Sequence, residues 1–343
     1  MSAKNILLAM PTNHNLHLIF EENLKYHGFH VCNISHFFHT EFRYPNLPTR
    51  LATKFRQLFL QEKKAKQNLQ FRLAKETILN EIKKIEQFDF ALFIRPDIYP
   101  LALIEQLKPH VAKWVAYQWD GIGRYPEVND YIEQFDRFFL FDPHDFRQPE
   151  HRFLPTTNFY FDHLPPLPHN PQNDCYFVGA HLDERVAEIS QFAQFAQAHG
   201  LKLDFNVGCA VRHEKTLRPL YPHNVTVSGQ TYGFADNLAR LQNSRILVDF
   251  KTPVHHGLSF RSFEALGYRK KLITTNHEIA HYDFYHPNNV CIWDGQDFDK
   301  ISAFLALPYH ELPPHIYEKY RFGNWIRHIL NLTPHIPISL PNI

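Results

Sequence analysis

The class of fold can be predicted from the stretch RILVDFKTPVHHGLSFRSFEALGYRKKLITTN, residues 245–276. Its first part, 246–250, is a short apolar run that is typical of a buried parallel strand. A polar loop follows at 251–256, then a helical pattern from Gly257 to Gly267, and then a second apolar strand at 271–275. Strand, loop, helix and strand in this order predict a right-handed crossover within a parallel sheet.

This corner of the predicted sheet suits a ligand that carries phosphate. The loop and the start of the helix lie at the carboxyl ends of the strands, where open parallel sheets bind their ligands. A helix N-terminus offers unpaired N–H groups and a partial positive charge, and Gly257 would allow a ligand to come close to the backbone. Further donors or positive charges come from Lys251, His255, His256 and Arg261.

Glu264 is the only acidic residue between Lys251 and Asn276. It follows Arg261 by three residues, so the two side chains share one face of the predicted helix. We expect Glu264 to accept hydrogen bonds from two ribose hydroxyls, while Arg261 and the helix amides hold a diphosphate. The alternative is a surface ion pair on a packing helix. Thr275 and Asn276, at the end of the second strand, complete the predicted donor site.

The segment GLSFRSFEALGYRKKLITTN resembles the donor-site segment of bacterial glycosyltransferases that build lipopolysaccharide or capsule. The segments YQWDG (117–121), FFLFDPHD (138–145) and YFVGAHLDER (176–185) extend the resemblance over most of the chain. It implies the α/β GT-B fold, in which two Rossmann-like domains have parallel sheets that face each other across a cleft, and the C-terminal domain binds a nucleotide sugar. Many retaining members carry two glutamates separated by seven residues. This chain has Glu264 at the second place and His256 at the first, which leaves the stereochemistry open.

The rest of the chain supplies two domains. Strand patterns at 5–10, 29–34, 88–95, 112–119 and 138–141 predict a Rossmann-like domain over 1–157. It lacks G-x-G-x-x-G, which disfavours an NAD(P) oxidoreductase. Five prolines between 155 and 171 predict a linker over 158–172, followed by a second Rossmann-like domain at 173–331 and a tail at 332–343. In the second domain, Gly179 follows a strand and would let the backbone approach the ligand.

Two strands of the first domain each end in a carboxylate at the same edge of the predicted sheet. Asp120 stands beside Gly121 and Gly123, and it is our candidate for the base that takes the acceptor proton if the reaction inverts. A cap or turn role is equally compatible with its position. Asp142 precedes Pro143, and for it we expect the turn role.

The segment 48–87 predicts a long helical insertion with ten Lys or Arg against four Glu. One interpretation is a solvated helix packed on its own domain. The other is a surface that docks on anionic lipid of the inner membrane, with Phe55, Leu58 and Phe59 inserting at the interface.

Other motifs and the composition limit the remaining choices. The sequence His277-Glu278-Ile279-Ala280-His281 matches the zinc-hydrolase pattern H-E-x-x-H, but it directly follows a strand and His286-Pro287 stands close behind it, so a secure helix is not expected. The net charge of +1 argues against general nucleic-acid binding. The four cysteines are far apart and form no C-x-x-C, which fits a reducing cytoplasm.

The sequence therefore predicts a cytoplasmic glycosyltransferase, peripheral at the inner face of the membrane. Its substrates would be a nucleotide sugar and a glycolipid or oligosaccharide acceptor of lipopolysaccharide, lipooligosaccharide or capsule synthesis. No cofactor or metal is expected. A non-catalytic protein that binds sugar nucleotides or glycans remains the alternative.

Overall fold

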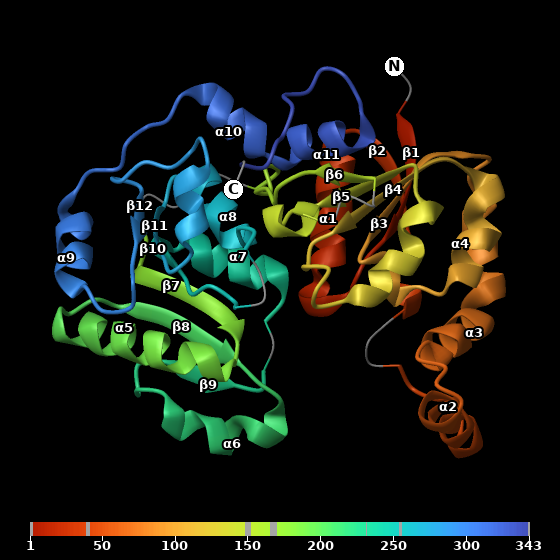
Figure 1. Cartoon of the computed structure of the whole chain (residues 1–343), viewed down its shortest axis with the longest axis horizontal. Helices are drawn as coiled ribbons and strands as arrows, with labels where there is room; N and C mark the ends of the chain where they lie inside the picture. The colour runs from red at the N-terminus through yellow and green to blue at the C-terminus, as the bar shows by residue number, and fades with distance from the viewer. Residues whose placement is uncertain are drawn as a thin grey trace. The chain divides into compact units, whose positions relative to one another are not determined.

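The computed structural model describes residues 3–38, 42–147, 152–164, 170–230, 232–253 and 256–341. The chain forms two compact units (Figure 1), the first made of Met1–Leu140 with Gln148–Leu154 and the second of Phe141–Arg147 with Pro155–Ile343. The chain thus enters the second unit briefly at Phe141, before its final entry at Pro155. The boundary predicted at 157 did not foresee this first entry. His255 lies outside the described residues.

The first unit is built on a six-stranded sheet in the order β2-β1-β3-β4-β5-β6. All pairings from β2 to β5 are parallel. β1, β3, β4 and β5 are mostly buried, as expected when helices cover both faces, whereas the edge strand β2 is largely half-buried. The strands are β1 (Lys4–Ala9), β2 (Phe29–Asn33), β3 (Phe88–Ile94), β4 (Val111–Gln118), β5 (Arg137–Leu140) and β6 (Phe153–Pro155), and the helices are α1 (Leu16–Tyr26), α2 (Leu47–Phe59), α3 (Ala65–Ile82) and α4 (Leu101–Leu107).

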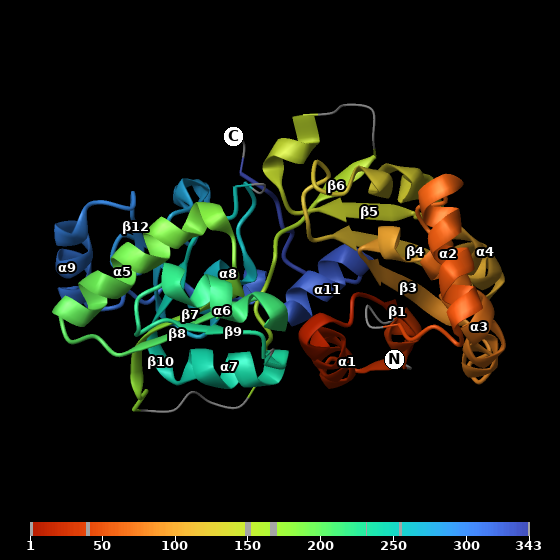
Figure 2. The ribbon, with the colours of Figure 1, turned by 90° about the horizontal axis from the view of Figure 1, so that it is seen from below.

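The predicted helical insertion forms two consecutive helices, α2 and α3, which contact each other (Figure 2). The side chain of Asn46 caps α2 by accepting the Thr49 N–H at 2.9 Å, and Pro48 occupies the first turn, where its missing N–H costs nothing. The two helices are separated at Gln61, whose positive φ of 52° is incompatible with a continuing α-helix.

The second unit contains a six-stranded sheet in the order β12-β11-β10-β7-β8-β9, and every pairing in it is parallel. Its strands are β7 (Asn173–Ala180), β8 (Leu203–Gly208), β9 (Thr226–Ser228), β10 (Ser244–Asp249), β11 (Lys271–Thr274) and β12 (Val290–Ile292). From the neighbours β7 and β10 the chain proceeds toward opposite edges of the sheet. This is the Rossmann order, and its switch point between β7 and β10 is where such sheets bind ligands.

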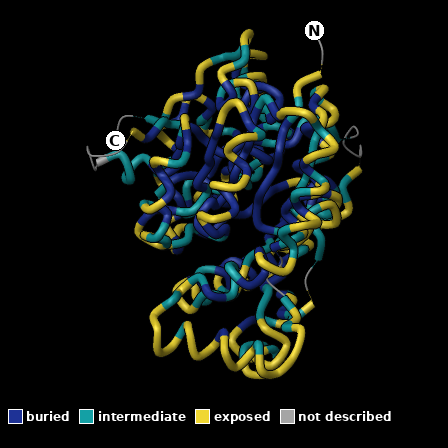
Figure 3. The backbone as a smooth tube through the Cα atoms, turned by 90° about the vertical axis from the view of Figure 1, so that its right-hand side faces the viewer, coloured by how far each residue is buried: buried dark blue, intermediate teal, exposed yellow. Residues whose placement is uncertain are grey.

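The helices of the second unit are α5 (Val186–Ala198), α6 (Glu214–Leu217), α7 (Phe234–Gln242), α8 (Phe260–Gly267), α9 (Phe298–Ala306), α10 (Pro314–Tyr320) and α11 (Phe322–Leu330). Aromatic rings fill much of the core: Phe177 meets Phe250 edge-on at 5.0 Å, and Phe192 stacks on Phe205 at 5.5 Å. In Figure 3 the buried stretches run through the interior of the trace and the exposed ones lie on its outside.

The predicted crossover is confirmed, because β10 and β11 pair in parallel with α8 between them. The helix begins at Phe260, however, and not at Gly257. Gly267 is its last residue and not a left-handed cap. A Cβ at Gly267 would lie 2.1 Å from the ring of Tyr160, so close packing explains this glycine.

The predicted linker over 158–172 is wrong in its first part. Phe159 and Phe161 are fully buried in the second unit, and the Phe159 ring lies 4.3 Å from that of Trp325. In the tail, residues 332–341 contain no helix or strand. Among the described residues, no helix has both the length and the apolar character needed to cross a membrane.

Candidate functional site

Arg261 occupies the switch point of the second sheet. Its Nη1 donates to the carbonyls of Val178 in β7 at 3.2 Å and Val248 in β10 at 3.3 Å, and its Nη2 also donates to Val178 at 3.2 Å. The guanidinium therefore joins the two strands where the sheet opens. The sequence predicted that these donors would hold a diphosphate, whereas they bind backbone oxygens.

A second arginine lies beside it, which the sequence analysis did not single out. The Arg185 side chain is buried, with Nη1 donating to the Phe250 carbonyl at 3.3 Å and Nη2 to that of Ala180. Burial lowers the pKa of Arg185, and the nearby Arg261 acts in the same direction. Its position as the first arginine or lysine after β7 was the available signal, because that loop reaches the switch point.

Glu264 is buried on α8, on the same helix as Arg261. Within the described ranges, no hydrogen bond or ion pair engages its carboxylate. Burial raises its pKa from 4.5 to about 7, Arg261 opposes this shift and Asp249 adds to it. A surface ion pair is thus ruled out for Glu264. A buried carboxylate without hydrogen-bond donors is costly by itself, and it is suited to accept hydroxyl groups of a ligand.

The start of α8 is left open toward a ligand. Ser259, the residue before the helix, uses its hydroxyl to donate to Asp249 Oδ1 at 2.9 Å, and Thr274 donates to Asp249 Oδ2 at 3.2 Å. Ser259 therefore makes no side-chain cap to the helix. In the part of the chain that the structure describes, the first amides of α8 have no side-chain acceptor, and such groups attract anions.

The two predicted glycines, Gly179 and Gly257, lie close against other protein atoms. A Cβ at Gly257 would lie 2.6 Å from the ring and 2.7 Å from the carbonyl oxygen of Phe141. A Cβ at Gly179 would lie 2.8 Å from the Phe177 ring and 3.4 Å from Arg185 Nη2. Both glycines therefore make room for neighbouring protein atoms.

Gly257→Ala is expected to destabilise the protein by about 1–3 kcal/mol, because the added methyl overlaps the Phe141 ring and backbone. Urea unfolding measures the effect. Gly123→Ala is the matched control, since a Cβ there meets nothing within 4 Å. Equal stabilities of the two variants would contradict the close contact.

The remaining predicted donor residues form one loop cluster. The Lys251 N–H donates to Thr275 Oγ1 at 2.9 Å, and Asn276 Nδ2 lies 3.5 Å from the carbonyl oxygens of both His256 and Gly257. Lys251 Nζ lies 3.4 Å from His256 Nδ1. Burial, together with Lys251, lowers the pKa of His256. Thr275 and Asn276 thus shape the loop, whereas Lys251 and His256 provide its polar side chains.

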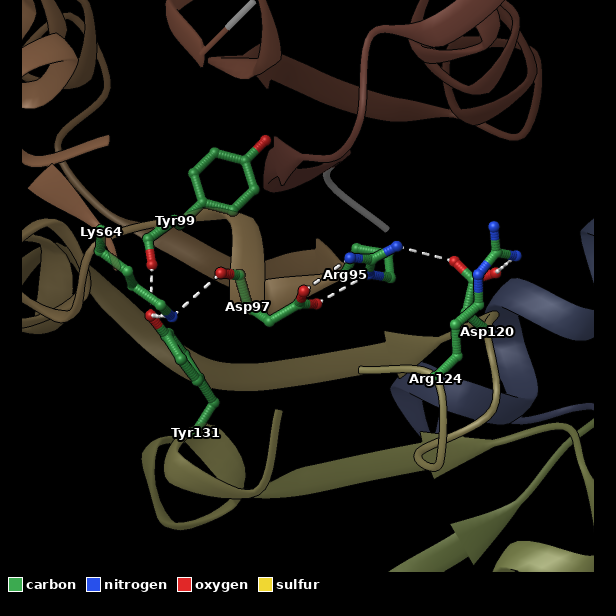
Figure 4. A network of polar contacts seen from close by, with 7 residues as sticks. All are labelled: Lys64, Arg95, Asp97, Tyr99, Asp120, Arg124 and Tyr131. Carbon is green, nitrogen blue, oxygen red and sulfur yellow. Dashed lines mark hydrogen bonds and ion pairs between the residues drawn. The ribbon is translucent and has the colours of Figure 1, made fainter. Parts of the chain in front are cut away.

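Asp120 belongs to a network in the first unit (Figure 4). Its Oδ2 accepts Arg95 Nη1 at 2.8 Å and its Oδ1 accepts Arg124 Nη1 at 3.3 Å. Arg95 also binds Asp97 through two bonds of 2.8 and 2.6 Å. The sequence analysis missed Arg95 and Asp97. Arg95 follows β3 with a positive φ of 58°, a strained conformation that is common at functional sites.

The network continues toward α3. Lys64, just before this helix, donates to the Asp97 carbonyl at 3.0 Å and to the Tyr131 hydroxyl, which in turn donates to the Tyr99 carbonyl at 2.5 Å. Figure 4 shows Asp120 at one end of this chain of contacts and Lys64 at the other. The role of Asp120 as a base stays a prediction, and its carboxylate is held by two guanidinium groups.

The segment His277–His281 does not have zinc-hydrolase geometry. It is a 3-10 helix, and His277 and His281 are exposed. The H-E-x-x-H site requires two histidines one turn apart on an α-helix, so this alternative is wrong. Glu278 instead lies near His144 and His256, with ligand atoms of all three within 4.8 Å of one another.

Comparisons with known proteins give matches by structure. No family model matches the chain, and no curated protein matches its sequence. One similar solved structure is an α-glucosyltransferase in complex with UDP and a 13-mer DNA containing an HMU base, with 12% identity, a TM-score of 0.52 and coverage of 88% of this chain and 90% of that one. Another is a UDP-forming α,α-trehalose-phosphate synthase from Burkholderia xenovorans, with 9% identity, a TM-score of 0.50 and coverage of 90% and 92%. The chain shares their α/β fold of two sheets, which confirms the predicted GT-B class of fold.

Proposed function

We propose that the protein is a glycosyltransferase that binds a nucleotide-sugar donor at the β7/β10 switch point of its second unit. The observation that carries the proposal is Glu264, a buried carboxylate without a hydrogen-bond partner among the described residues, next to Arg261 at the point where a Rossmann-type sheet opens. The fold shared with two sugar-transferring enzymes supports it. Because those two are described with UDP, we take UDP as the first candidate nucleotide.

The residues have distinct roles in this proposal. Glu264 accepts hydrogen bonds from the ribose hydroxyls. The first amides of α8 and the Lys251 ammonium stabilise the leaving diphosphate. Arg261 and Arg185 add positive charge to the site and bind the backbone carbonyls at the ends of β7 and β10. Protein groups thus carry the charge stabilisation, and the transfer needs no metal.

A nucleotide-sugar screen in EDTA tests the proposal. A donor at 100 times its dissociation constant raises the free energy of unfolding by about 2.7 kcal/mol, which thermal unfolding detects. We expect UDP to stabilise the protein and uridine to do so much less, because uridine lacks the diphosphate. A donor that binds only when Mn²⁺ is added would contradict metal independence. Release of UDP from a bound donor separates an enzyme from a non-catalytic binding protein.

The acceptor side of the proposal rests on α2. This helix packs on α3, and Thr53 is its only buried residue in the described chain. Its large apolar side chains face solvent, with exposed fractions of 53% for Phe55, 75% for Leu58 and 71% for Phe59. α2 thus packs on its own unit through α3 and still leaves these three side chains exposed.

Basic residues accompany this apolar surface, since Arg50, Lys54 and Arg56 on α2 are also exposed. Apolar and basic side chains on one exposed helix suit a surface of anionic lipid, and each basic residue contributes about 1 kcal/mol near such a surface. We propose that α2 docks the enzyme on the inner face of the cytoplasmic membrane. The acceptor is then a lipid-linked precursor of lipopolysaccharide, lipooligosaccharide or capsule.

Liposome sedimentation tests the docking. Binding is expected to require anionic lipid, to weaken with salt, and to drop in the double variants Leu58→Ser/Phe59→Ser and Arg50→Glu/Lys54→Glu. Lys64 is not a suitable target, because its ammonium binds within the first unit. The matched control is Leu220→Ser, which removes an exposed leucine of the second unit. Unchanged sedimentation of both double variants would remove the membrane proposal and leave the donor site untouched.

A further inference from the structure

Three short segments of the second unit bring together two histidines and a glutamate. His144 lies on the 3-10 turn Pro143–Arg147, His256 lies in the loop after β10, and Glu278 lies on the 3-10 helix His277–His281. Their possible ligand atoms lie within 4.8 Å of one another. The cluster cannot be recognised from the sequence, because its first two members are 112 positions apart, as 256 minus 144 shows.

The backbone under these side chains is fixed by two further residues. Asp142 accepts the His144 N–H through Oδ1 at 3.0 Å and the His256 N–H through Oδ2 at 2.8 Å. Asn276 accepts the Glu278 N–H at 3.2 Å and faces the His256 carbonyl at 3.5 Å. Asp142 thus has the expected turn role and also ties two of the three segments together. Partners of this kind orient the ligands of metal sites.

Two polar atoms of the cluster are buried and have no hydrogen-bond partner among the described residues: His144 Nε2 and Glu278 Oε2. His144 Nε2 lies 4.0 Å from Glu278 Oε1, too far for a hydrogen bond and close enough for both to reach one ion. Buried polar atoms that lack a partner call for a bound ion or water. Both atoms belong to residues that bind metal readily.

We propose that His144, His256 and Glu278 bind a divalent transition-metal ion, for which zinc is the best match. Two imidazoles and one carboxylate, with water as the fourth ligand, form a common tetrahedral zinc set, whereas Mg²⁺ and Ca²⁺ prefer oxygen ligands. The site uses one residue of the H-E-x-x-H motif and neither of its histidines. It shares the loop of Lys251 and His256 with the proposed donor site, whose transfer reaction is proposed to use no metal.

Binding requires a small rearrangement. The His144 and His256 rings are stacked 3.7 Å apart with their planes at 10°. A metal lies in the plane of each imidazole that binds it, so one ring must turn about its Cβ–Cγ bond, a torsion with a broad energy profile. Lys251 lies 3.4 Å from His256 and repels a cation, while the Asp142 carboxylate, which accepts the His256 backbone N–H, attracts it.

Calorimetric titration of zinc into the full-length protein, treated with EDTA and dialysed, tests the proposal. We expect one ion per chain and an affinity at least about tenfold weaker in His144→Ala and in Glu278→Gln. His281→Ala is the matched control, because it changes an exposed histidine of the same segment, and it should bind zinc like the wild type. The control is needed because the chain has 24 histidines, and exposed histidines can bind zinc without a defined site.

Circular dichroism verifies that each variant is folded. If His144→Ala does not fold, the zinc affinity of Glu278→Gln alone tests the site. The visible spectrum of bound Co²⁺ gives a second readout, since its intensity reports four-coordination. Absence of one-to-one zinc binding in the wild type overturns the site. Loss of binding in His281→Ala to the same degree as in Glu278→Gln overturns it as well, because the ion would then sit on the exposed segment.

Discussion

Glutamine in place of Glu264 is expected to weaken donor binding and to stabilise the protein above pH 7. Glutamine keeps the shape of the side chain but removes the charge and one acceptor oxygen. A site that binds hydroxyls through a carboxylate loses affinity when that acceptor is changed, and we expect at least about a tenfold increase in the dissociation constant. Calorimetric titration with a UDP-sugar measures this part.

The stability effect depends on pH in a defined direction. Glu264 ionises near 4.5 in the unfolded chain and near about 7 when folded, because burial raises its pKa. Between these pH values the folded state binds more protons than the unfolded state, so the free energy of unfolding falls as the pH rises. The contribution of protonated Glu264 to the free energy of unfolding is fully present below pH 4.5 and is lost above pH 7. At about 1.4 kcal/mol per pH unit, the loss amounts to about 3 kcal/mol.

Glu264→Gln lacks this titration, so it should match the wild type near pH 4.5 and exceed it by up to about 3 kcal/mol at pH 8. Urea unfolding at both pH values measures the difference. Glu105→Gln, which changes an exposed glutamate of the first unit, is the control and should alter neither stability nor binding. Unchanged donor affinity in folded Glu264→Gln contradicts the ribose role. A stability gain that is equal at both pH values contradicts the raised pKa.

Arg261→Ala is expected to have the largest effect on stability, a loss of about 3–5 kcal/mol. The substitution leaves the carbonyls of Val178 and Val248 without their donor, and it removes the cation nearest to Glu264. Arg261→Lys keeps the charge but lacks the planar fork that reaches both strands, so its loss should be smaller. Urea unfolding of both variants gives these values.

The double variant Arg261→Ala/Glu264→Gln separates the two causes. If the cation mainly offsets the buried carboxylate, the double variant recovers part of the stability lost in Arg261→Ala. If the hydrogen bonds of Arg261 to the carbonyls of β7 and β10 are the main cause, the double variant is as unstable as Arg261→Ala. If Arg261→Lys lowers the stability but binds the donor like the wild type, Arg261 has only a structural role. Wild-type stability of Arg261→Ala would contradict both roles.

The sequence predicted the part of the fold that local patterns determine. Apolar runs with a polar loop and a helical period between them identified the β10, α8 and β11 crossover, because strand and helix periodicities differ and turn residues separate them. The position of Glu264 on α8, near the carboxyl ends of the strands, followed from that crossover alone. The sequence also shows directly that the first domain lacks the G-x-G-x-x-G motif.

What the sequence could not predict depends on partners that are distant along the chain. Gly257 is required by Phe141, and Gly267 by Tyr160, so each glycine resembled a ligand contact or a helix cap when viewed locally. Arg185 and Arg261 bind backbone carbonyls of neighbouring strands, which carry no sequence signal. The early entry into the second unit at Phe141 was missed for the same reason, since contacts such as the bond of Asp142 to the His256 N–H join residues that are far apart in the sequence.

Hydrogen exchange with and without a saturating UDP-sugar, followed by mass spectrometry, tests the location of the donor site most directly. Ligand contacts and the ordering of the loops slow exchange at the bound segment. We predict slower exchange in peptides that cover 176–185 and 257–264, where Arg185, Arg261 and Glu264 lie, and unchanged exchange around Arg95 in the first unit. Slower exchange confined to the first unit, or no change in 257–264 under saturating ligand, would contradict a donor site at the β7/β10 switch point.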